Sequence, residues 1–314
     1  MALSGRAPNP DLSFVVLTES FGAIAEVVER LAAQENAAEI ELVIATPDES
    51  ALAPPAAAIT AFAGVTVVGT PLLPMAPARA AAVRAARAPI VVLGETHVFA
   101  EPEWAGGLLR AHDGPWVAVT PGIGNANSEG GLSWVGLLMD YGRFPQGGIR
   151  CELADAASYN AAYKRAALLE LGEELELLLE PGSVLHAELR ARGGRFLHEP
   201  GARIDHLNVA RLRPWLHERY LGGRLFGAAR RRPWARRRAL LYAAGSPLVA
   251  PLRFVRTLRQ ARASEGVPRT FVPALALGCV VWAIGEGVGY AVGAGANEER
   301  QMLEYEQHKS RYVR

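Results

Sequence analysis

The side chains best placed for chemistry in this chain are Glu95 and His97, a carboxylate and an imidazole two residues apart. They follow the apolar run PIVV directly, within the stretch LGETHVFAEPEW. Alternate residues of an extended segment point to the same side, and open α/β sheets bind ligands at the carboxyl ends of their strands. The pair therefore predicts a nucleotide site that uses a divalent metal, Mn²⁺ or Mg²⁺, and imidazole suits Mn²⁺ better. The alternative is an exposed loop pair without a ligand.

The elements that would position this pair alternate between strands and helices. Short apolar runs predict strands, and apolar residues three or four apart predict helices. The expected strands are 13–18, 41–46, 65–68, 90–93 and 116–120, and the expected helices include 23–33 and 79–88. This alternation predicts an α/β fold with a mostly parallel central sheet.

The segment around Glu95 resembles the part of family 2 glycosyltransferases of the GT-A fold that carries their Asp-Xaa-Asp motif. Glu95 and His97 stand at the two ligand positions, and the downstream block Pro102-Glu103-Trp104 matches as well. The resemblance covers about residues 11–211 and implies a GT-A nucleotide-sugar-binding domain there. Residues 212–314 would then form a basic, amphipathic and hydrophobic helical extension associated with a membrane.

The resemblance also implies residues that bind the donor besides Glu95. Asp48 and Glu49 follow the second expected strand, where the family places an acidic residue for the nucleobase and ribose. Such residues equally suit a turn or a helix cap. Arg79 lies where the family often has a basic residue near the diphosphate, and an arginine fork suits a phosphate. The alternative is a solvated helix residue.

Two segments resemble the acceptor side of the family. The stretch DAASYNAAYKRAALLEL matches the segment that lines the donor and acceptor pocket, and it makes Asn160 and Tyr163 the predicted acceptor-binding residues. The loop GIGNANSEGGLSW offers Asn125, Asn127 and Ser128 as hydrogen-bonding groups for sugar hydroxyls. Loops also collect such residues for their turns alone.

Residues 177–211 resemble the family's arginine-rich helix, following strand and terminal histidine. This match makes His206 a further metal ligand or a phosphate contact, unless it is structural. An inverting transferase needs a carboxylate that takes the proton from the acceptor hydroxyl. The family's acidic pair is absent at the aligned Pro181-Gly182, so the nearest carboxylate, Glu180, is the predicted catalytic base.

The charge of the chain is unevenly distributed. Residues 211–270 carry fifteen arginines against two glutamates (+13) and residues 271–314 have a net charge of −1, which leaves the first 210 residues with a net charge of −11. A basic segment interleaved with apolar runs favours an anionic membrane surface over nucleic acid as its partner. The two cysteines are far apart and the N-terminus lacks an apolar signal-peptide core, so we expect a reducing cytoplasm and no export.

The C-terminal hundred residues have their own pattern. Residues 246–262 place leucines and a valine toward one side and arginines toward another, which is typical of an interfacial helix. Residues 271–297 are apolar with Glu286 as their only charge, and glycine recurs at 285, 289 and 293. The run is long enough to span a bilayer, although a buried glutamate would be costly there. Three alternatives stay open: interfacial or re-entrant docking, a single span through 271–293, and a soluble helical hairpin. In either membrane case the arginines before the run predict that the catalytic domain lies at the cytoplasmic face.

Together these patterns predict an inverting glycosyltransferase that moves a sugar from a nucleotide diphosphate to a lipid-linked or membrane-proximal acceptor. The alternative from another class is a non-catalytic GT-A scaffold at the membrane, because the Asp-Xaa-Asp motif and the aligned acidic base are absent. A nucleotidyltransferase should carry a glycine-rich phosphate loop after its first strand, and residues 19–22 (ESFG) form a poor one. The partners expected are therefore a nucleotide-diphosphate sugar and a membrane, without nucleic acid.

Overall fold

The computed structural model of the chain describes residues 9–52, 54–179 and 185–313. The described residues form two compact units. Unit 1 lies within Met1–Ile123, Gln146–Glu180 and Val184–Asp205, and unit 2 lies within Gly124–Pro145 and His206–Arg314.

The described strands form one sheet in the order β3-β2-β1-β4-β8-β6-β9-β5, with β7 paired to β9. They are β1 (Leu12–Leu17), β2 (Ile40–Thr46), β3 (Gly64–Gly69), β4 (Ile90–Leu93), β5 (Val98–Ala100), β6 (Trp116–Asn125), β7 (Cys151–Leu153), β8 (Ala162–Lys164) and β9 (Arg195–His206). The first four strands of this order pair in parallel, whereas β8 is antiparallel to both β4 and β6, and β7 is antiparallel to β9. The predicted α/β class is confirmed, but the prediction of a mostly parallel sheet holds only for this half. Parallel neighbours need crossover connections, and the regular strand–helix alternation ends after β4.

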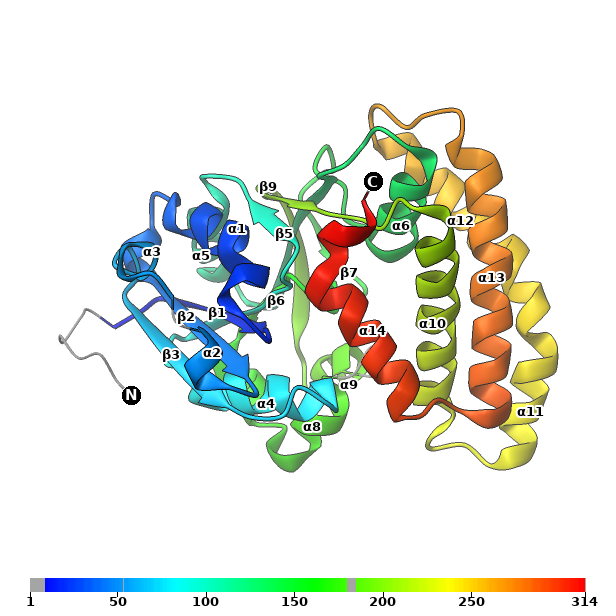
Figure 1. The fold of residues 1–314 in the computed structure, drawn as a ribbon, viewed down its shortest axis with the longest axis horizontal. Coiled ribbons are helices and arrows are strands. Elements are labelled where there is room, and N and C mark those ends of the chain that lie inside the picture. Colours follow the sequence, from blue (N-terminus) through cyan, green and yellow to red (C-terminus); the bar gives the residue numbers. More distant parts are fainter. Residues whose placement is uncertain (1–8, 53, 180–184, 314) are drawn as a thin grey trace. The chain divides into compact units, whose positions relative to one another are not determined.

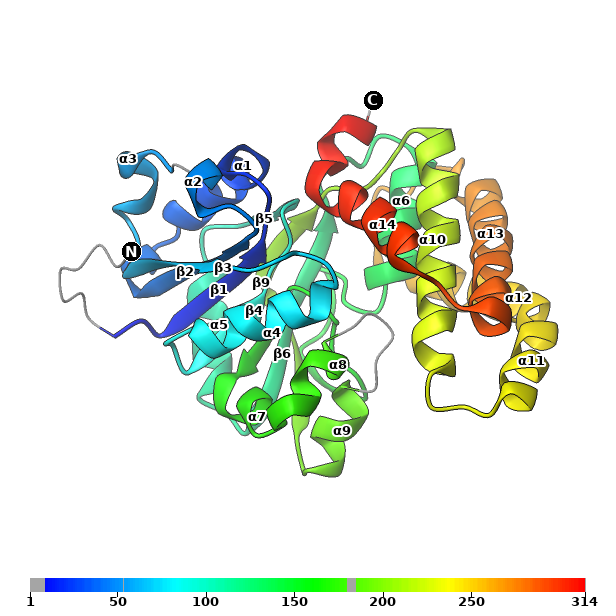
Figure 2. The same ribbon diagram turned by 60° about the horizontal axis from the view of Figure 1, so that its bottom comes forward.

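The parallel half of the sheet is the core of unit 1. Every residue of β1 and β2 is buried, as expected for parallel strands that are covered on both faces. Unit 1 has the helices α1 (Phe21–Ala32), α2 (Glu49–Leu52), α3 (Ala56–Ile59), α4 (Met75–Ala85), α5 (Trp104–His112), α7 (Arg165–Leu169), α8 (Leu175–Leu178) and α9 (Leu185–Ala191). Because parallel crossovers are right-handed, α1 and α3 lie on one face of the strands and α4 lies on the other (Figure 2).

A fully buried carboxylate ties the first three strands together. Glu41 of β2 accepts hydrogen bonds from the hydroxyls of Ser13 in β1 (2.6 Å) and Thr66 in β3 (2.9 Å). It also accepts bonds from the backbone nitrogen (2.8 Å) and Nε (2.7 Å) of Arg87. Burial alone would raise the pKa of Glu41, but the bonds from Ser13 and Arg87 outweigh it and hold the pKa below its ordinary value. Glu41 is thus a satisfied structural group.

Unit 2 is helical. Its helices are α6 (Gly131–Tyr141), α10 (Leu212–Arg231), α11 (Arg236–Gly245), α12 (Val249–Gln260), α13 (Phe271–Val292) and α14 (Ala296–His308), followed by the short 3₁₀ helix η5 (Lys309–Tyr312). Helix α13 packs against α6, α10, α11 and α12. Figure 1 shows α10 and α13 side by side over most of their length.

Glycines on both helices allow α10 and α13 to approach so closely. A Cβ atom on Gly223 or Gly227 of α10 would clash with a backbone carbonyl oxygen of α13. A Cβ atom on Gly285 or Gly289 of α13 would clash in turn with the carbonyl oxygens of Tyr220 or Arg224. The glycine stripe of the sequence therefore serves as a packing surface between these two helices.

The one charge of the apolar helix α13 has its partners inside unit 2. Glu286 accepts hydrogen bonds from Trp282 Nε1 (3.2 Å) and the Tyr290 hydroxyl (3.0 Å), and its Oε2 lies 3.7 Å from Nη2 of Arg253 in α12. Among the described helices, α13 is long and apolar enough to cross a membrane. Its buried glutamate is nevertheless neutralised by a neighbouring helix of the same chain.

The close contact between α10 and α13 can be tested with Gly289→Ala. The added methyl group would push the Arg224 carbonyl away, so we expect a loss of about 1–3 kcal/mol in the free energy of unfolding, measured by urea titration. Gly245→Ala, at the open end of α11, is the control, because a Cβ there meets no atom within 4 Å. Equal stability of the two variants would refute the packing role.

Candidate functional site

Glu95 follows the carboxyl end of β4, as the sequence predicted, and its side chain is only 6% exposed. Its Oε2 accepts a hydrogen bond of 2.5 Å from Nδ2 of Asn160. Asn160 has a left-handed backbone (φ 63°), and its own nitrogen donates to the carbonyl oxygen of Leu93 at 2.7 Å. An unusual backbone conformation thus places an amide donor on the carboxylate, which is typical of functional sites.

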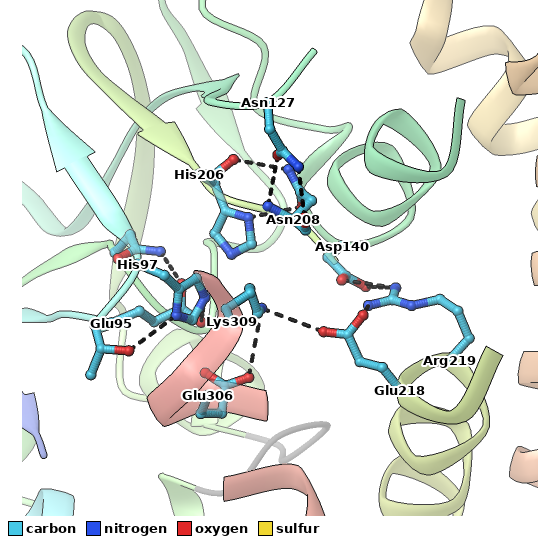
Figure 3. Close-up of polar contacts among 12 residues, drawn as sticks. Glu95, His97, Asn127, Asp140, His206, Asn208, Glu218, Arg219, Glu306 and Lys309 are labelled. Atoms are coloured by element: carbon cyan, nitrogen blue, oxygen red, sulfur yellow. Dashed lines mark hydrogen bonds and ion pairs between the residues drawn. The ribbon is translucent and has the colours of Figure 1, made fainter. Parts of the chain in front are cut away.

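His97 lies buried beside Glu95. Its Nε2 is 3.9 Å from Glu95 Oε1 (Figure 3). Its Nδ1 is 3.3 Å from the hydroxyl oxygen of Thr96. The spacing of two along an extended segment therefore brings the carboxylate and the imidazole together. The alternative of an exposed loop pair is wrong for these two side chains, since both are buried.

His206 is the last residue of β9. The imidazole is buried, and its Nδ1 lies 2.9 Å from Oδ1 of Asn208. The ring of Tyr141 packs against it with centroids 5.0 Å apart. Burial holds the pKa of His206 well below its ordinary value, so the imidazole is neutral, the form that binds metals.

Glu95 and His97 of unit 1 and His206 of unit 2 are buried side chains that each offer one ligand atom to a metal ion. One carboxylate oxygen and two imidazole nitrogens fit Mn²⁺ or Zn²⁺ better than Mg²⁺, which prefers oxygen ligands. All three residues are buried, as a water-excluding metal centre requires. The donor set is therefore compatible with the divalent cation expected from the sequence.

Arg79 of α4 is buried rather than solvated. Its guanidinium carbon lies 4.3 Å from the ring centroid of Tyr159, and its buried Nη1 has no hydrogen-bond partner among the described residues. Arg84, one turn later on the same helix, is exposed and pairs with Glu176 at 2.6 Å. The two arginines of this helix thus have different surroundings, and Arg79 is the one with an unused buried donor.

The other residues predicted to bind the donor or to act as the catalytic base are Asp48, Glu49 and Glu180. Asp48 and Glu49 are exposed at the start of α2, and Asp48 Oδ1 accepts bonds from the nitrogen (2.9 Å) and hydroxyl (2.6 Å) of Ser50. This is the turn cap that the sequence allowed, and a nucleotide role for the two residues stays a prediction. Glu180, the predicted base, lies outside the described residues.

The predicted acceptor residues make contacts inside unit 1. Asn160 holds Glu95, as described above. Tyr163 is fully buried, and its hydroxyl donates to the carbonyl oxygen of Ala157 (2.9 Å) and also contacts His186 Nε2 (2.9 Å). The other nitrogen of His186 lies 2.5 Å from Asp155 Oδ1. Burial raises the pKa of Tyr163, so the phenol stays protonated. Their acceptor role stays a prediction.

Sequence reasoning missed a chain of paired charges in unit 2, of which Glu218, Arg219 and Lys309 are buried. Asp140 and Glu218 both pair with Arg219, at 2.9 and 3.1 Å, and Lys309 Nζ lies 3.5 Å from Glu218 Oε1 (Figure 3). Burial would raise the pKa of Glu218, but Arg219 and Lys309 outweigh it and lower the pKa. The network fixes η5 on α10. The only sequence signal was Glu218, an isolated acid in a basic helix.

The left-handed conformation of Asn160 can be tested by comparing Asn160→Gly with Asn160→Ala. Both variants lose the hydrogen bond to Glu95, but only glycine adopts this backbone without steric cost. We expect Asn160→Ala to have a free energy of unfolding about 1 kcal/mol lower than Asn160→Gly in urea titration. An equal free energy of unfolding for the two variants would show that the backbone at residue 160 is not constrained to the left-handed conformation.

No protein-family model matches the chain, and a comparison with curated proteins gives no match. Solved structures have a similar backbone arrangement at low identity. GalNAc-T7 with UDP, GalNAc and Mn²⁺ is 14% identical to this chain, with a TM-score of 0.48. The match covers 63% of this chain and 44% of that chain, so this chain spans less than half of that protein's length. The mannosyltransferase PcManGT from Pyrobaculum calidifontis, in complex with GDP-Man and Mn²⁺, is 16% identical with a TM-score of 0.45, over 98% of this chain and 82% of that chain. S. aureus TarS 1–349 is 15% identical with a TM-score of 0.45, over 95% and 91%. What each of these proteins binds is a property of that protein.

Proposed function

We propose that this chain is a GT-A-type glycosyltransferase that transfers a sugar, with inversion, from a nucleotide diphosphate to a lipid-linked or membrane-proximal acceptor. The observation that carries the proposal is the buried guanidinium of Arg79, whose Nη1 has no partner among the described residues. A buried donor without a partner is costly, and a phosphate oxygen is the acceptor that an arginine fork fits best.

The surroundings of Arg79 connect it to the carboxylate site. Its guanidinium stacks on Tyr159, and the next residue along the chain, Asn160, donates to Glu95. A diphosphate bound by Arg79 would therefore lie on the side of the sheet edge where Glu95 and His97 could hold a cation. Arginine and cation together suit two adjacent phosphates.

Glu95, His97 and His206 are the residues that we propose to hold the cation. When bound, the cation would stabilise the negative charge of the departing nucleotide diphosphate. The chain's own contribution is to bury these ligands, to keep His206 neutral and to orient Glu95 through Asn160. Arg79 adds a fixed positive charge that needs no metal.

The transfer breaks the bond between the anomeric carbon and the diphosphate oxygen and forms a bond from that carbon to the acceptor oxygen. Inversion follows when the acceptor attacks opposite the leaving group, and the acceptor proton passes to a carboxylate. We keep Glu180 as the proposed base. Asp48 and Glu49 are proposed for the nucleobase and ribose, and Asn160 and Tyr163 for the acceptor side.

Calorimetric titration with UDP, GDP and dTDP, with and without Mn²⁺, tests the donor site. We expect one nucleotide to bind with metal dependence, and Arg79→Gln to weaken its binding by about tenfold or more, because a charge-assisted bond to phosphate is lost. Glu95→Gln should remove the metal dependence instead.

Arg84→Gln is the matched control, since this arginine is exposed on the same helix and pairs with Glu176. It should leave nucleotide affinity unchanged, and the corresponding nucleoside without phosphates should bind wild type and Arg79→Gln alike. Undiminished diphosphate binding by Arg79→Gln would contradict the proposed role. No binding of any nucleotide would favour the alternative of a non-catalytic scaffold.

We further propose that unit 2 docks on an anionic membrane, which would supply the acceptor. Three exposed apolar residues follow one another at helical spacing. Leu248 (70% exposed) is the last residue of the 3₁₀ helix η3 (Ser246–Leu248), and Leu252 (72% exposed) and Val255 lie on α12. The same helix buries Thr257 and most of Arg253. A helix of a water-soluble protein normally buries its apolar stripe, and this one exposes it.

Positive charge surrounds the exposed apolar residues. Exposed arginines on α10, α11, α12 and the loops beside them suit anionic head groups, each worth about 1 kcal/mol near such a surface. They are Arg230, Arg232, Arg236, Arg237, Arg238, Arg256, Arg259, Arg262 and Arg269. Charge complementarity therefore favours a bilayer over a protein partner. The excess of arginine places unit 2 at the cytoplasmic face in this proposal.

Of the modes that the sequence left open, we propose interfacial docking rather than a single span through α13. Support comes from Glu286, which pairs with Arg253 of α12, because a spanning α13 would have to carry this pair or break it. The packing of α13 on four other helices of the chain also favours a helix that stays with unit 2.

Flotation with vesicles tests the docking surface. Wild type should float with vesicles that contain anionic lipid and less with neutral ones, and Leu248→Asp/Leu252→Asp should reduce recovery by about tenfold. Ile149→Asp is the control, since Ile149 is a comparably exposed apolar residue (83%) in unit 1. Equal recovery of the double variant would refute the surface, and resistance of wild type to alkaline carbonate extraction would show a span instead.

A further inference from the structure

The bonds around His206 determine which of its two nitrogens carries a proton. A neutral imidazole has one N–H donor and one lone pair, and the hydrogen-bond partner of one nitrogen fixes the role of the other. Here Nδ1 faces the side-chain amide of Asn208. The question is therefore whether that amide presents its oxygen or its NH₂ group to the ring.

Two neighbouring acceptors determine the orientation of the Asn208 amide. Asn208 Nδ2 lies 2.9 Å from the carbonyl oxygen of His206, which can only accept. Nδ2 also lies 3.0 Å from Oδ1 of Asn125, and that oxygen is identified in turn because it accepts from the backbone nitrogen of Asn127 at 3.2 Å. Two independent acceptors thus require the NH₂ group at this position. The Asn208 oxygen must then face His206.

Other contacts hold Asn208 in place. Its backbone nitrogen donates to Oδ1 of Asn127 (2.9 Å), and Asn127 Nδ2 donates back to its carbonyl oxygen (2.8 Å), as Figure 3 shows. The hydroxyl of Ser133 lies 2.8 Å from Asn125 Oδ1 and 2.9 Å from Asn127 Oδ1. Asn208 is itself buried. Rotation of its amide would break both Nδ2 bonds, to the His206 carbonyl oxygen and to Asn125 Oδ1.

We propose that Asn208 is a positioning residue that keeps His206 protonated at Nδ1 and so presents Nε2 as the nitrogen that binds the cation. The inference rests on the proposed function for the cation, whereas the tautomer stands on the hydrogen bonds alone. An outer partner that fixes the tautomer of a ligating histidine typically contributes 10–100-fold to metal affinity.

Nitrogen NMR of ¹⁵N-histidine-labelled full-length protein tests the tautomer directly, with the His206 signals assigned by loss in His206→Gln. At neutral pH and without metal, we expect the pattern of a ring protonated at Nδ1. Asn208→Ala should shift the population toward Nε2–H, because the acceptor at Nδ1 is lost. Asn127→Ala is the matched control, since it loses the bonds to the Asn208 backbone and none to the imidazole or the Asn208 amide.

Calorimetric titration with Mn²⁺ alone completes the test. Asn208→Ala should bind Mn²⁺ about 10–100-fold more weakly, and Asn127→Ala should stay much closer to wild type. A wild-type ring protonated at Nε2 would overturn the proposal, and this result needs no variant to fold. Unchanged Mn²⁺ affinity in Asn208→Ala would overturn the role toward the cation. Absence of Mn²⁺ binding by wild type, with the Nδ1–H tautomer intact, would refute the metal site and leave the positioning of the ring established.

Discussion

Burial of the Glu95 carboxylate is the constraint on which the candidate site depends. A carboxylate taken out of water costs free energy unless hydrogen bonds and positive charge compensate it. Asn160 supplies a hydrogen bond only because its backbone takes a left-handed conformation, and that backbone is itself bonded to the end of β4. The strand that carries the carboxylate therefore also holds the residue that compensates it, and a bound cation would add to that compensation.

Buried charged groups in this chain differ in how their charge is compensated. Glu41 has four hydrogen bonds from three residues and joins the strands. Glu218 and Arg219 neutralise each other within a longer charge network. Arg79 differs, because its buried guanidinium stacks on Tyr159 and no ion pair among the described residues compensates its charge. The same residue type on the same helix, Arg84, is exposed and paired, so burial rather than composition distinguishes Arg79, which we propose to bind the diphosphate.

Sequence patterns predicted the parallel strands and the Glu95–His97 pair because both depend on local periodicity. The antiparallel half of the sheet follows from pairing between β8, β6 and β9, which no local pattern encodes. Asn208 was missed for the same reason, since a single asparagine after a strand has no signal until Asn125 and Asn127 are brought beside it. Arg79 was noticed through its resemblance to the family, but only tertiary packing on Tyr159 distinguishes it from a solvated arginine.

The C-terminal helices show how composition and packing can point to different environments. By length and hydropathy α13 could cross a membrane, yet its glycines fit the backbone of α10 and its glutamate pairs with Arg253. Those contacts use the glycine and glutamate side of α13 within unit 2. Because Arg253 and Thr257 turn toward the interior of the unit, the leucines of the same amphipathic segment are left on its surface. Stabilising the buried glutamate and exposing an apolar face are thus two consequences of one orientation of α12, and the docking that we propose on an anionic membrane surface would favour both.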